Sequence, residues 1–324
     1  MDLFSLIKFL RVKKFSDVTT WTALVGATDP KEIEISKQAS SKLNILVQCL
    51  MLRRLKTDVD SETKEKILEL PENMFEPVDI HMQGLEKEAY DIYLNYNQEK
   101  VLQEISGENR QLENQPKMTT KKGISCILEL LLRQRQSCNH FYLISDVIGM
   151  ENMPKLKDKK YVDIFSQNYK SAKLRELLKR IDFIVTVAKD KCVVMTEWRG
   201  MLNIIINHLN KLKIKHDVIN GDVPAEQRQE IVREFNEPVK KDENGSVLLL
   251  TLKTGDVGLN LIGGNHIFIY EMPWNPAIEQ QACDRVYRIG QTKPVYTYKP
   301  NSKEPKMSKE DYLEIFGLTK VRKN

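Results

Sequence analysis

Two arginines and a glutamine lie four and three residues apart near the end of the chain. In the segment PWNPAIEQQACDRVYRIGQ these residues are Gln281, Arg285 and Arg288. On a single helix they would share one face. A guanidinium group keeps its charge and presents forked donors to anionic oxygens, so this face suits a phosphate group. The alternative is a surface helix on which Asp284 and Arg288 form an ordinary i,i+4 ion pair.

Local signals predict that residues 276–289 form one helix. Asn275 is a good N-cap, Pro276 suits the first helical position and Gly290 suits the C-terminal stop. The apolar stripe of this helix would consist of Ile278, Ala282, Val286 and Ile289.

A glycine-containing turn precedes this segment. The sequence KTGDVGLN follows the apolar run SVLLLTL, and Gly255 and Gly258 allow a tight turn and close approach to a phosphate or a neighbouring loop. Two glycines alone are a weak signal. The dinucleotide-binding pattern GxGxxG is absent, which disfavours a nicotinamide enzyme.

Alternating strands and helices position these residues from Ser171 onward. The predicted strands are 191–196, 216–220, 246–252, 266–271 and 295–299, and the predicted helices are 171–187, 198–212 and 224–236. This order indicates a parallel sheet with helices on both faces. Ligands gather at the carboxyl ends of such strands, where the glycine turn and the arginine helix both begin, so their position favours the phosphate-binding interpretation.

The first 165 residues have a different pattern. Apolar residues recur at helical spacing in Leu3, Leu6, Ile7 and Leu10, and again in Leu43, Leu46, Val47 and Leu50, which predicts a mostly helical region. Residues 104–123 and 149–160 are polar or rich in turn-forming residues, and we expect them to be exposed loops.

Composition excludes several classes of protein. The 324 residues are 41% hydrophobic and 29% charged, and no apolar run approaches the length of a membrane helix. The first residues do not resemble a secretory signal, so we expect an intracellular protein. The five cysteines are scattered; Cys138 and His140 lie close together but lack a second pair of ligands, so we predict no metal site.

The net charge of +5 is small, but basic residues form clusters. Each cluster could follow a phosphate backbone, or could simply be a solvated helix end or loop. The clusters are Arg11, Lys13 and Lys14; Arg53, Arg54 and Lys56; Lys157, Lys159 and Lys160; and Lys211, Lys213 and Lys215.

Several segments, in order, resemble the second RecA-like lobe of Swi/Snf-type DNA-dependent ATPases of helicase superfamily two. They are LMLRRLKTDV, WRGMLNIII, INGDVPAEQRQEIVREFN and the long run from LLLTLKTGDVGLN to DRVYRIGQ. The GGNH run and RQSCNHFYLI most resemble the branch that contains transcription termination factor two and Lodestar. The resemblance implies an α/β fold, with a RecA-like parallel sheet preceded by a mostly helical region.

The same resemblance implies roles for the phosphate-binding candidates. Arg285 and Arg288 match the arginine-finger motif, which would neutralise charge on the γ-phosphoryl group of ATP bound with Mg²⁺ by the other lobe, and Gln281 would support that motif. Gly255, Gly258 and Asn260 lie in the turn that couples the nucleotide to DNA.

DNA-binding roles are implied for five further residues. Lys253 and Thr254 match the coupling motif, Trp198 and Arg199 lie in a motif near one DNA strand, and Trp274 would brace DNA contacts or, alternatively, anchor its turn as a buried aromatic. Asn220, Gly221 and Arg228 match a block with a coupling or structural role.

The sequence departs from the family pattern at several points. None of its fourteen glycines is followed by Lys and then Ser or Thr, so the phosphate loop of a first lobe is not recognisable. The Asp242–Glu243 pair precedes a strand and does not end one, so it does not match the acidic strand that orients magnesium. Asp256 replaces a usual glycine, which would weaken the coupling turn. The first residues resemble the stretch that follows the last motif of lobe one. KMSKEDYLEIFGL resembles the extreme C-terminus of the family, but it follows VYTYKP without the bracing segment that usually lies between them. We expect this arrangement from an internal deletion, alternative exon use or a faulty gene model.

We therefore expect three regions: residues 1–165, a helical linker or protrusion after a missing first ATPase lobe; 166–300, the RecA-like C-terminal lobe; and 301–324, a tail. The expected function is that of one lobe of a nuclear double-stranded-DNA translocase, which removes or remodels protein complexes on DNA. The expected partners are a first lobe or a full-length motor, and the transcription machinery or chromatin. The lobe would be inactive alone. The alternatives are a non-catalytic relative that binds DNA or a partner motor, and an unrelated nucleotide-binding protein.

Overall fold

Six parallel strands form the sheet that positions the candidate functional residues. The computed structural model describes residues 2–12, 15–25, 37–52, 54–106, 120–150, 153–255 and 258–300. In the sheet the strand order is β1-β6-β5-β2-β4-β3, and every neighbouring pair is parallel. The strands are β1 (Asn73–Val78), β2 (Cys192–Thr196), β3 (His216–Ile219), β4 (Val247–Thr251), β5 (His266–Ile269) and β6 (Val295–Pro300).

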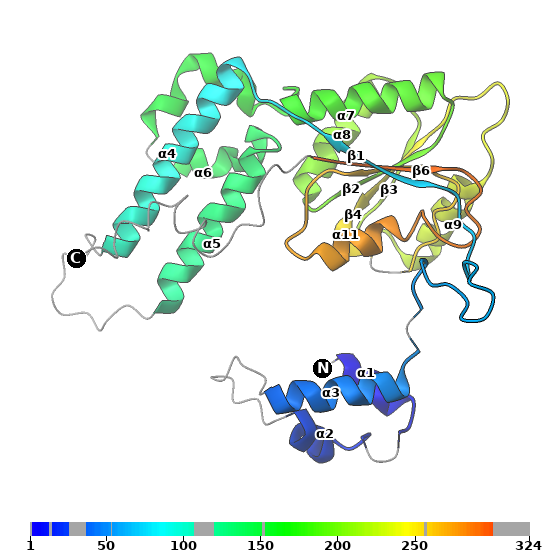
Figure 1. Cartoon of the computed structure of the whole chain (residues 1–324). Helices are drawn as coiled ribbons and strands as arrows, with labels where there is room; N and C mark the ends of the chain where they lie inside the picture. Colours follow the sequence, from blue (N-terminus) through cyan, green and yellow to red (C-terminus); the bar gives the residue numbers. More distant parts are fainter. Residues whose placement is uncertain are drawn as a thin grey trace. The chain divides into compact units, whose positions relative to one another are not determined.

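Helices cover both faces of this sheet, as predicted (Figure 1). On one face, α7 (Ala172–Asp182) and α8 (Arg199–Lys211) pack against alternate strand residues such as Val194 and Leu249. On the other, α9 (Ala225–Asn236) and α11 (Pro276–Cys283) pack against Val193, Leu248 and Ile267. Alternation of side chains along each strand therefore supplies both cores. A short helix, α10 (Leu252–Gly255), follows β4, and the π-helix η4 (Phe183–Val187) follows α7.

A helical layer lies between β1 and α7 in the sequence. Its own core includes Tyr93, Phe141, Ile144 and Tyr161. Its elements are α4 (Gly84–Ser106), α5 (Thr120–Ser137), η1 (Phe141–Ile144), α6 (Ser145–Met150), η2 (Pro154–Lys157) and η3 (Lys159–Phe165). The layer and the RecA-like sheet belong to one unit, residues 70–324. The expected boundary near residue 165 stays a prediction, and β1 of the sheet precedes it. The expected tail, 301–324, lies outside the described residues.

Residues 1–69 form a separate unit. It contains α1 (Asp2–Phe9), α2 (Val18–Val25) and α3 (Lys37–Leu50), and Phe4 packs on Trp21 with ring centroids 5.6 Å apart. The predicted helices are present as α1 and α3, in which Ile7 and Leu46 are buried, whereas Leu6, Leu10 and Leu50 are exposed. Within the described ranges of the chain, none of the helices is both long and apolar enough to cross a bilayer.

Three features differ from the sequence expectations. Residues 149–160 were expected to be an exposed loop, but 154–157 form η2, and Met153 and Leu156 are buried in the core of the helical layer. Strand β1 lies in a region predicted to be mostly helical and pairs with β6, so that Asn73 opposes Val295. The arginine segment was predicted to be one helix over 276–289, and this is wrong, because α11 ends at Cys283. The backbone N–H groups of Arg285 and Val286 bond to the oxygens of Ala282 and Cys283, three residues back, which tightens the chain into turns.

Candidate functional site

The loops after β2, β3, β4 and β5 lie at the same edge of the sheet because all the strands are parallel. We call this the carboxyl edge. Trp198 and Arg199 follow β2, Asn220 follows β3, the glycine turn follows β4, and Trp274 follows β5. The structure therefore brings the predicted DNA-facing residues to one edge, as parallel-sheet topology requires.

Arg285 and Arg288 lie in a turn that follows α11, which we call the arginine turn (residues 284–291). Both side chains are half-buried, whereas Gln281 is exposed on α11. The backbone N–H of Leu261 donates to the carbonyl oxygen of Arg285 at 2.9 Å, and Nη1 of Arg288 donates to the carbonyl oxygen of Leu259 at 3.4 Å. These bonds tie the arginine turn to the segment after the glycine turn, and this tertiary attachment is the physical reason why the helix ends early.

The cap of α11 agrees with prediction, whereas its C-terminal end does not. Oδ1 of Asn275 accepts from the N–H of Ala277 at 2.9 Å, and Pro276 occupies the first turn. Gly290 has a φ of 98°, a conformation that favours glycine, but it closes the arginine turn and not the helix. Ile289 was predicted to face the core and is 72% exposed.

Gln291 stabilises the arginine turn and was not identified from the sequence. Its side chain is buried, and Nε2 donates to the carbonyl oxygens of Gly264, Ile262 and Val286 at 2.9, 3.3 and 3.3 Å. Its Oε1 accepts from the N–H groups of Thr292 and Lys293. The available signal was a glutamine directly after a glycine at the end of the arginine motif.

The glycine turn is described only in part. Lys253 and Gly255 lie in α10, and α10 contacts α11. Gly258 is exposed with a φ of 61°, and the carbonyl oxygen of the exposed Asn260 accepts from Nδ2 of Asn236. Asp256, predicted to weaken coupling, lies outside the described residues.

Thr254 is directed toward the protein in this structure. Its hydroxyl is buried and lies 2.6 Å from the hydroxyl of Thr251, 2.8 Å from the carbonyl oxygen of Thr251 and 3.2 Å from the carbonyl oxygen of Ile219. This side chain therefore joins the glycine turn to the end of β3.

The loop after β3 is held by Arg228. Its guanidinium donates to the carbonyl oxygens of Val223, Asn220 and Gly221 at 2.7, 3.2 and 3.3 Å. In the same loop Asp222 forms an ion pair with Arg199, and both side chains are mostly exposed. A predicted DNA-binding arginine is thus paired with a carboxylate.

The two tryptophans of the carboxyl edge lie near Arg135 of α5. Its guanidinium carbon is 5.3 Å from the ring centroid of Trp198 and 4.8 Å from that of Trp274. Trp198 is half-buried and precedes α8, whereas Trp274 is 58% exposed, which does not fit the alternative of a buried anchor.

A buried carboxyl group lies beneath these loops. Glu271 accepts from the Thr196 hydroxyl at 2.8 Å and from the Glu197 N–H at 2.9 Å. Burial raises the pKa of Glu271 to about 7, although the nearby charge of Lys173 opposes that shift. Burial likewise lowers the pKa of Lys173, whose Nζ donates to Oδ1 of Asn139 at 2.6 Å.

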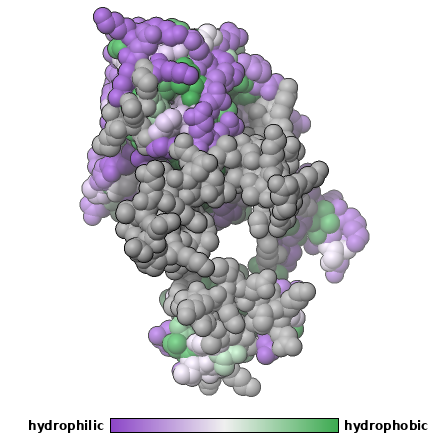
Figure 2. Space-filling view, turned by 90° about the vertical axis from the view of Figure 1, so that its left-hand side faces the viewer, coloured by the Kyte–Doolittle hydropathy of each residue, from purple (hydrophilic) through white to green (hydrophobic). Residues whose placement is uncertain are grey.

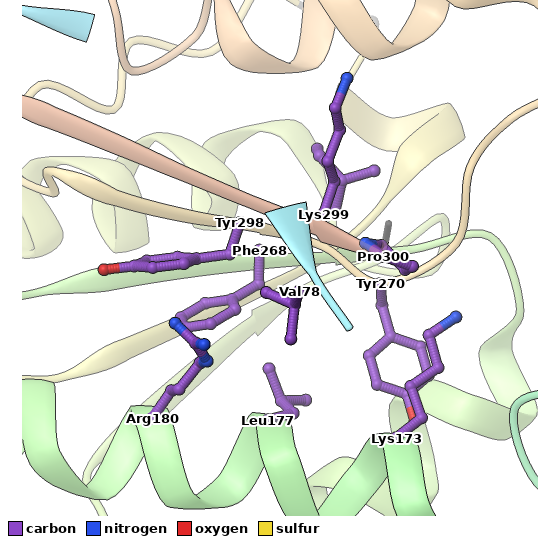
Figure 3. A pocket seen from close by; sticks show the side chains of 10 residues that line it. Val78, Lys173, Leu177, Arg180, Phe268, Tyr270, Tyr298, Lys299 and Pro300 are labelled. Atoms are coloured by element: carbon purple, nitrogen blue, oxygen red, sulfur yellow. The ribbon is translucent and has the colours of Figure 1, made fainter. Parts of the chain in front are cut away.

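A small cavity between α7 and the strands β1, β5 and β6 does not fit a nucleotide (Figure 3). Its volume of about 30 Å³ suits a single water molecule. The cationic groups that line it have protein partners: Arg180 pairs with Glu76, Lys299 with Glu279, and Lys173 with Asn139.

The remaining candidates have local partners. Both ring nitrogens of His140 have partners. Nε2 lies 2.9 Å from the backbone carbonyl oxygen of Tyr169, and Nδ1 accepts from the N–H of Tyr142, so His140 caps the start of η1. In the described part of the chain there is no group of three His, Cys, Asp or Glu side chains suited to a metal.

Two members of the predicted basic clusters have partners within the described part of the chain. Lys160 pairs with Glu88, and Lys211 bonds to Asn168, whereas Lys13, Lys14 and Arg53 are not described. Hydrophilic side chains cover most of the described surface seen in Figure 2. These contacts agree with the interpretation of solvated loops and helix ends.

Comparison with known proteins places these features in a family. Residues 1–143 match the SNF2-related domain, and residues 169–290 match the helicase conserved C-terminal domain. Transcription termination factor 2 of Drosophila melanogaster is 29% identical over 92% of this chain and 35% of its own length. The chain spans about a third to a half of the length of the curated relatives it matches first.

Solved structures share the fold. The C-terminal part of the Fun30 ATPase domain superposes with a TM-score of 0.53 and 20% identity, covering 77% of this chain and 90% of that chain. The Sulfolobus solfataricus SWI2/SNF2 ATPase core in complex with dsDNA gives a TM-score of 0.50 and 22% identity, covering 93% and 54%. Both likenesses support a RecA-like fold for the sheet and its helices.

Proposed function

This chain belongs to the Swi/Snf-type ATPases of helicase superfamily two, and on that premise we propose that it works as the C-terminal lobe of an ATP-driven motor on double-stranded DNA. The observation that carries the proposal is the attachment of the arginine turn to the segment after the glycine turn, through Leu261 N–H to Arg285 and Arg288 to Leu259. A change at either turn would be transmitted to the other through these bonds.

The arginine turn suits the phosphates of ATP. Arg285 and Arg288 are half-buried, so their charges are partly desolvated, and the guanidinium of Arg288 is oriented by the carbonyl oxygen of Leu259. ATP with Mg²⁺, bound together with a first lobe, would supply the phosphoryl-transfer chemistry. This chain's part is to bind phosphate oxygens and to pass closure of the lobes to the carboxyl edge.

Duplex DNA suits the carboxyl edge. Arg199 is an exposed cation, and the exposed Trp274 lies in the adjoining loop. Contacts of such groups to backbone phosphates would carry little sequence preference. The name of the Drosophila relative, transcription termination factor 2, supports a role at transcription complexes. We therefore propose that the protein acts in the nucleus, where it would remove or remodel protein complexes on DNA.

A binding assay tests the DNA part of this proposal. We expect the 324-residue chain to bind random-sequence duplexes with an affinity that falls linearly with salt on logarithmic axes. Arg199→Ala should weaken binding and reduce the slope by about one, the share of one phosphate contact. Arg233→Ala is a matched control, because Arg233 is exposed and pairs only with Glu230 among the described residues. A duplex affinity that does not change with salt concentration would contradict the proposal.

A hydrolysis assay tests the nucleotide part. ATP turnover is measured with and without duplex DNA, for the chain and for Arg285→Ala and Arg288→Ala. We expect no turnover by the chain alone, with duplex binding intact, and a DNA-stimulated turnover when a first lobe is supplied, which both variants abolish. DNA-stimulated turnover by the chain alone would contradict the proposal that it is a single lobe. Turnover that persists in both variants would contradict the assignment of the arginine turn. Duplex binding without turnover under any condition, with a full-length motor included, would favour the non-catalytic alternative.

A further inference from the structure

Arg135, on α5 of the helical layer, contacts both tryptophan loops. These loops are residues 197–199, after β2, and residues 271–275, after β5. Nη2 of Arg135 donates to Oε2 of Glu197 at 2.9 Å and to the carbonyl oxygen of Met272 at 2.8 Å. The same guanidinium lies over the rings of Trp198 and Trp274. One side chain thus contacts two loops that come from neighbouring strands.

The backbone of Arg135 is connected to the same loops by a second route. Its carbonyl oxygen accepts from Nδ2 of Asn139 at 3.2 Å, and Oδ1 of Asn139 accepts from Nζ of Lys173 at 2.6 Å. The charge of Lys173 acts on Glu271, and Glu271 accepts from the N–H of Glu197. Glu197 returns to Arg135 through the ion pair, so hydrogen bonds, this ion pair and one electrostatic interaction, between Lys173 and Glu271, complete the circuit.

From this circuit we propose that Arg135 is a positioning residue, which fixes the relative geometry of the two tryptophan loops and joins the helical layer to them. The proposal rests on the proposed function for the role of these loops in DNA binding. Arg135 is about four-fifths buried and its charge is paired with Glu197, so its task is to hold the loops and not to contact phosphate.

The chemistry of guanidinium suits this task. A planar group can stack on aromatic rings while its edge donates to a carboxylate and a carbonyl oxygen. A lysine at this position would keep the charge but would lack the plane and the forked donors. Arg133, two residues earlier on α5, bonds to Gln136 and lies 4.0 Å from Glu129, both on its own helix. It provides a matched control.

The first test separates positioning from phosphate contact by the salt dependence of duplex binding. We expect Arg135→Ala to weaken binding about tenfold at every salt concentration, the scale of a lost charge-assisted bond and cation–π contact, with the slope unchanged. Arg133→Ala should match the unaltered chain. Arg135→Lys should fold normally but still show most of the loss of duplex affinity that is expected for Arg135→Ala. A slope reduced by about one, or full affinity in the lysine variant, would overturn the proposal.

The second test does not depend on DNA. The chain has three tryptophans, and Trp21→Phe leaves only Trp198 and Trp274 as emitters. In that background, Arg135→Ala and Arg135→Lys should shift the emission and raise its quenching by acrylamide, because both rings lose a covering group. Arg133→Ala should change neither. Unaltered quenching in the Arg135 variants would overturn the proposal. Absent duplex binding with altered quenching would instead contradict only the proposed function.

Discussion

The side-chain amide of Gln291 donates to the carbonyl oxygen of Gly264 at 2.9 Å, and this bond joins the arginine turn to the segment that follows the glycine turn. The same amide reaches Val286, inside the arginine turn. A change in either segment is therefore transmitted to the other through a buried, fully used side chain.

Replacing this side chain should be costly. We expect Gln291→Ala to lower the free energy of unfolding by about 2–3 kcal/mol, because buried carbonyl oxygens would lose their donor. Gln280→Ala is the control, since Gln280 is exposed and contacts Asp284 on the surface, and it should change stability by less than about 0.5 kcal/mol. Urea unfolding measures both. Equal stabilities for the two variants would contradict the role given to Gln291.

The pairing of Arg199 with Asp222 predicts opposite effects on duplex binding. Asp222→Asn removes a carboxylate that competes with DNA phosphate for Arg199, and should tighten binding about two- to fivefold at low salt, the scale of an exposed ion pair. Arg199→Ala should weaken binding. The gain should vanish in the double variant, as fluorescence anisotropy with a labelled duplex would show. A gain that persists without Arg199 would assign the effect to net charge alone.

Stability should depend on pH through Glu271. Its pKa is raised from the usual 4.5 to about 7 in the folded chain, chiefly by burial. The folded state therefore binds more protons than the unfolded state between these values, and stability should fall as pH rises through this window, by up to about 1 kcal/mol per pH unit. Glu271→Gln removes the titration, so its stability should vary less from pH 5 to pH 7. Parallel profiles for both proteins would contradict this expectation.

The cap of α11 offers a local test. We expect Asn275→Ala to cost about 1 kcal/mol of stability, because the N–H of Ala277 loses its acceptor. Asn275→Asp retains an acceptor and places a negative charge at the helix start, so it should be neutral or stabilising. Thermal unfolding of the two variants, compared with the unaltered chain, checks this difference.

The elements that could be predicted are those encoded by neighbouring residues. The run SVLLLTL is apolar throughout because β4 is buried on both faces, and its position was predicted within one residue at each end. Asn275 and Pro276 capped their helix as expected, because a cap depends only on the residues that follow it.

Contacts between distant residues could not be predicted in this way. Arg135 reaches partners 62 and 137 positions away, and nothing near it in the sequence marks it for that role. The end of α11 is set by bonds from Leu261 and Leu259, which lie outside the helix. Strand β1 has a mixed pattern of exposure and contains Pro77, as suits the edge of a sheet, and its pairing partner lies near the other end of the described chain.

This placement of β1 has a consequence for how the protein folds as it is made. Synthesis proceeds from the N-terminus, so β1 leaves the ribosome long before β6, the one strand it pairs with. The helical layer, whose core comes from residues 89–164, can form in the interval. The pairing of β1 must therefore wait until residues 295–300 have been made, and until then β1 needs protection from pairing with other chains.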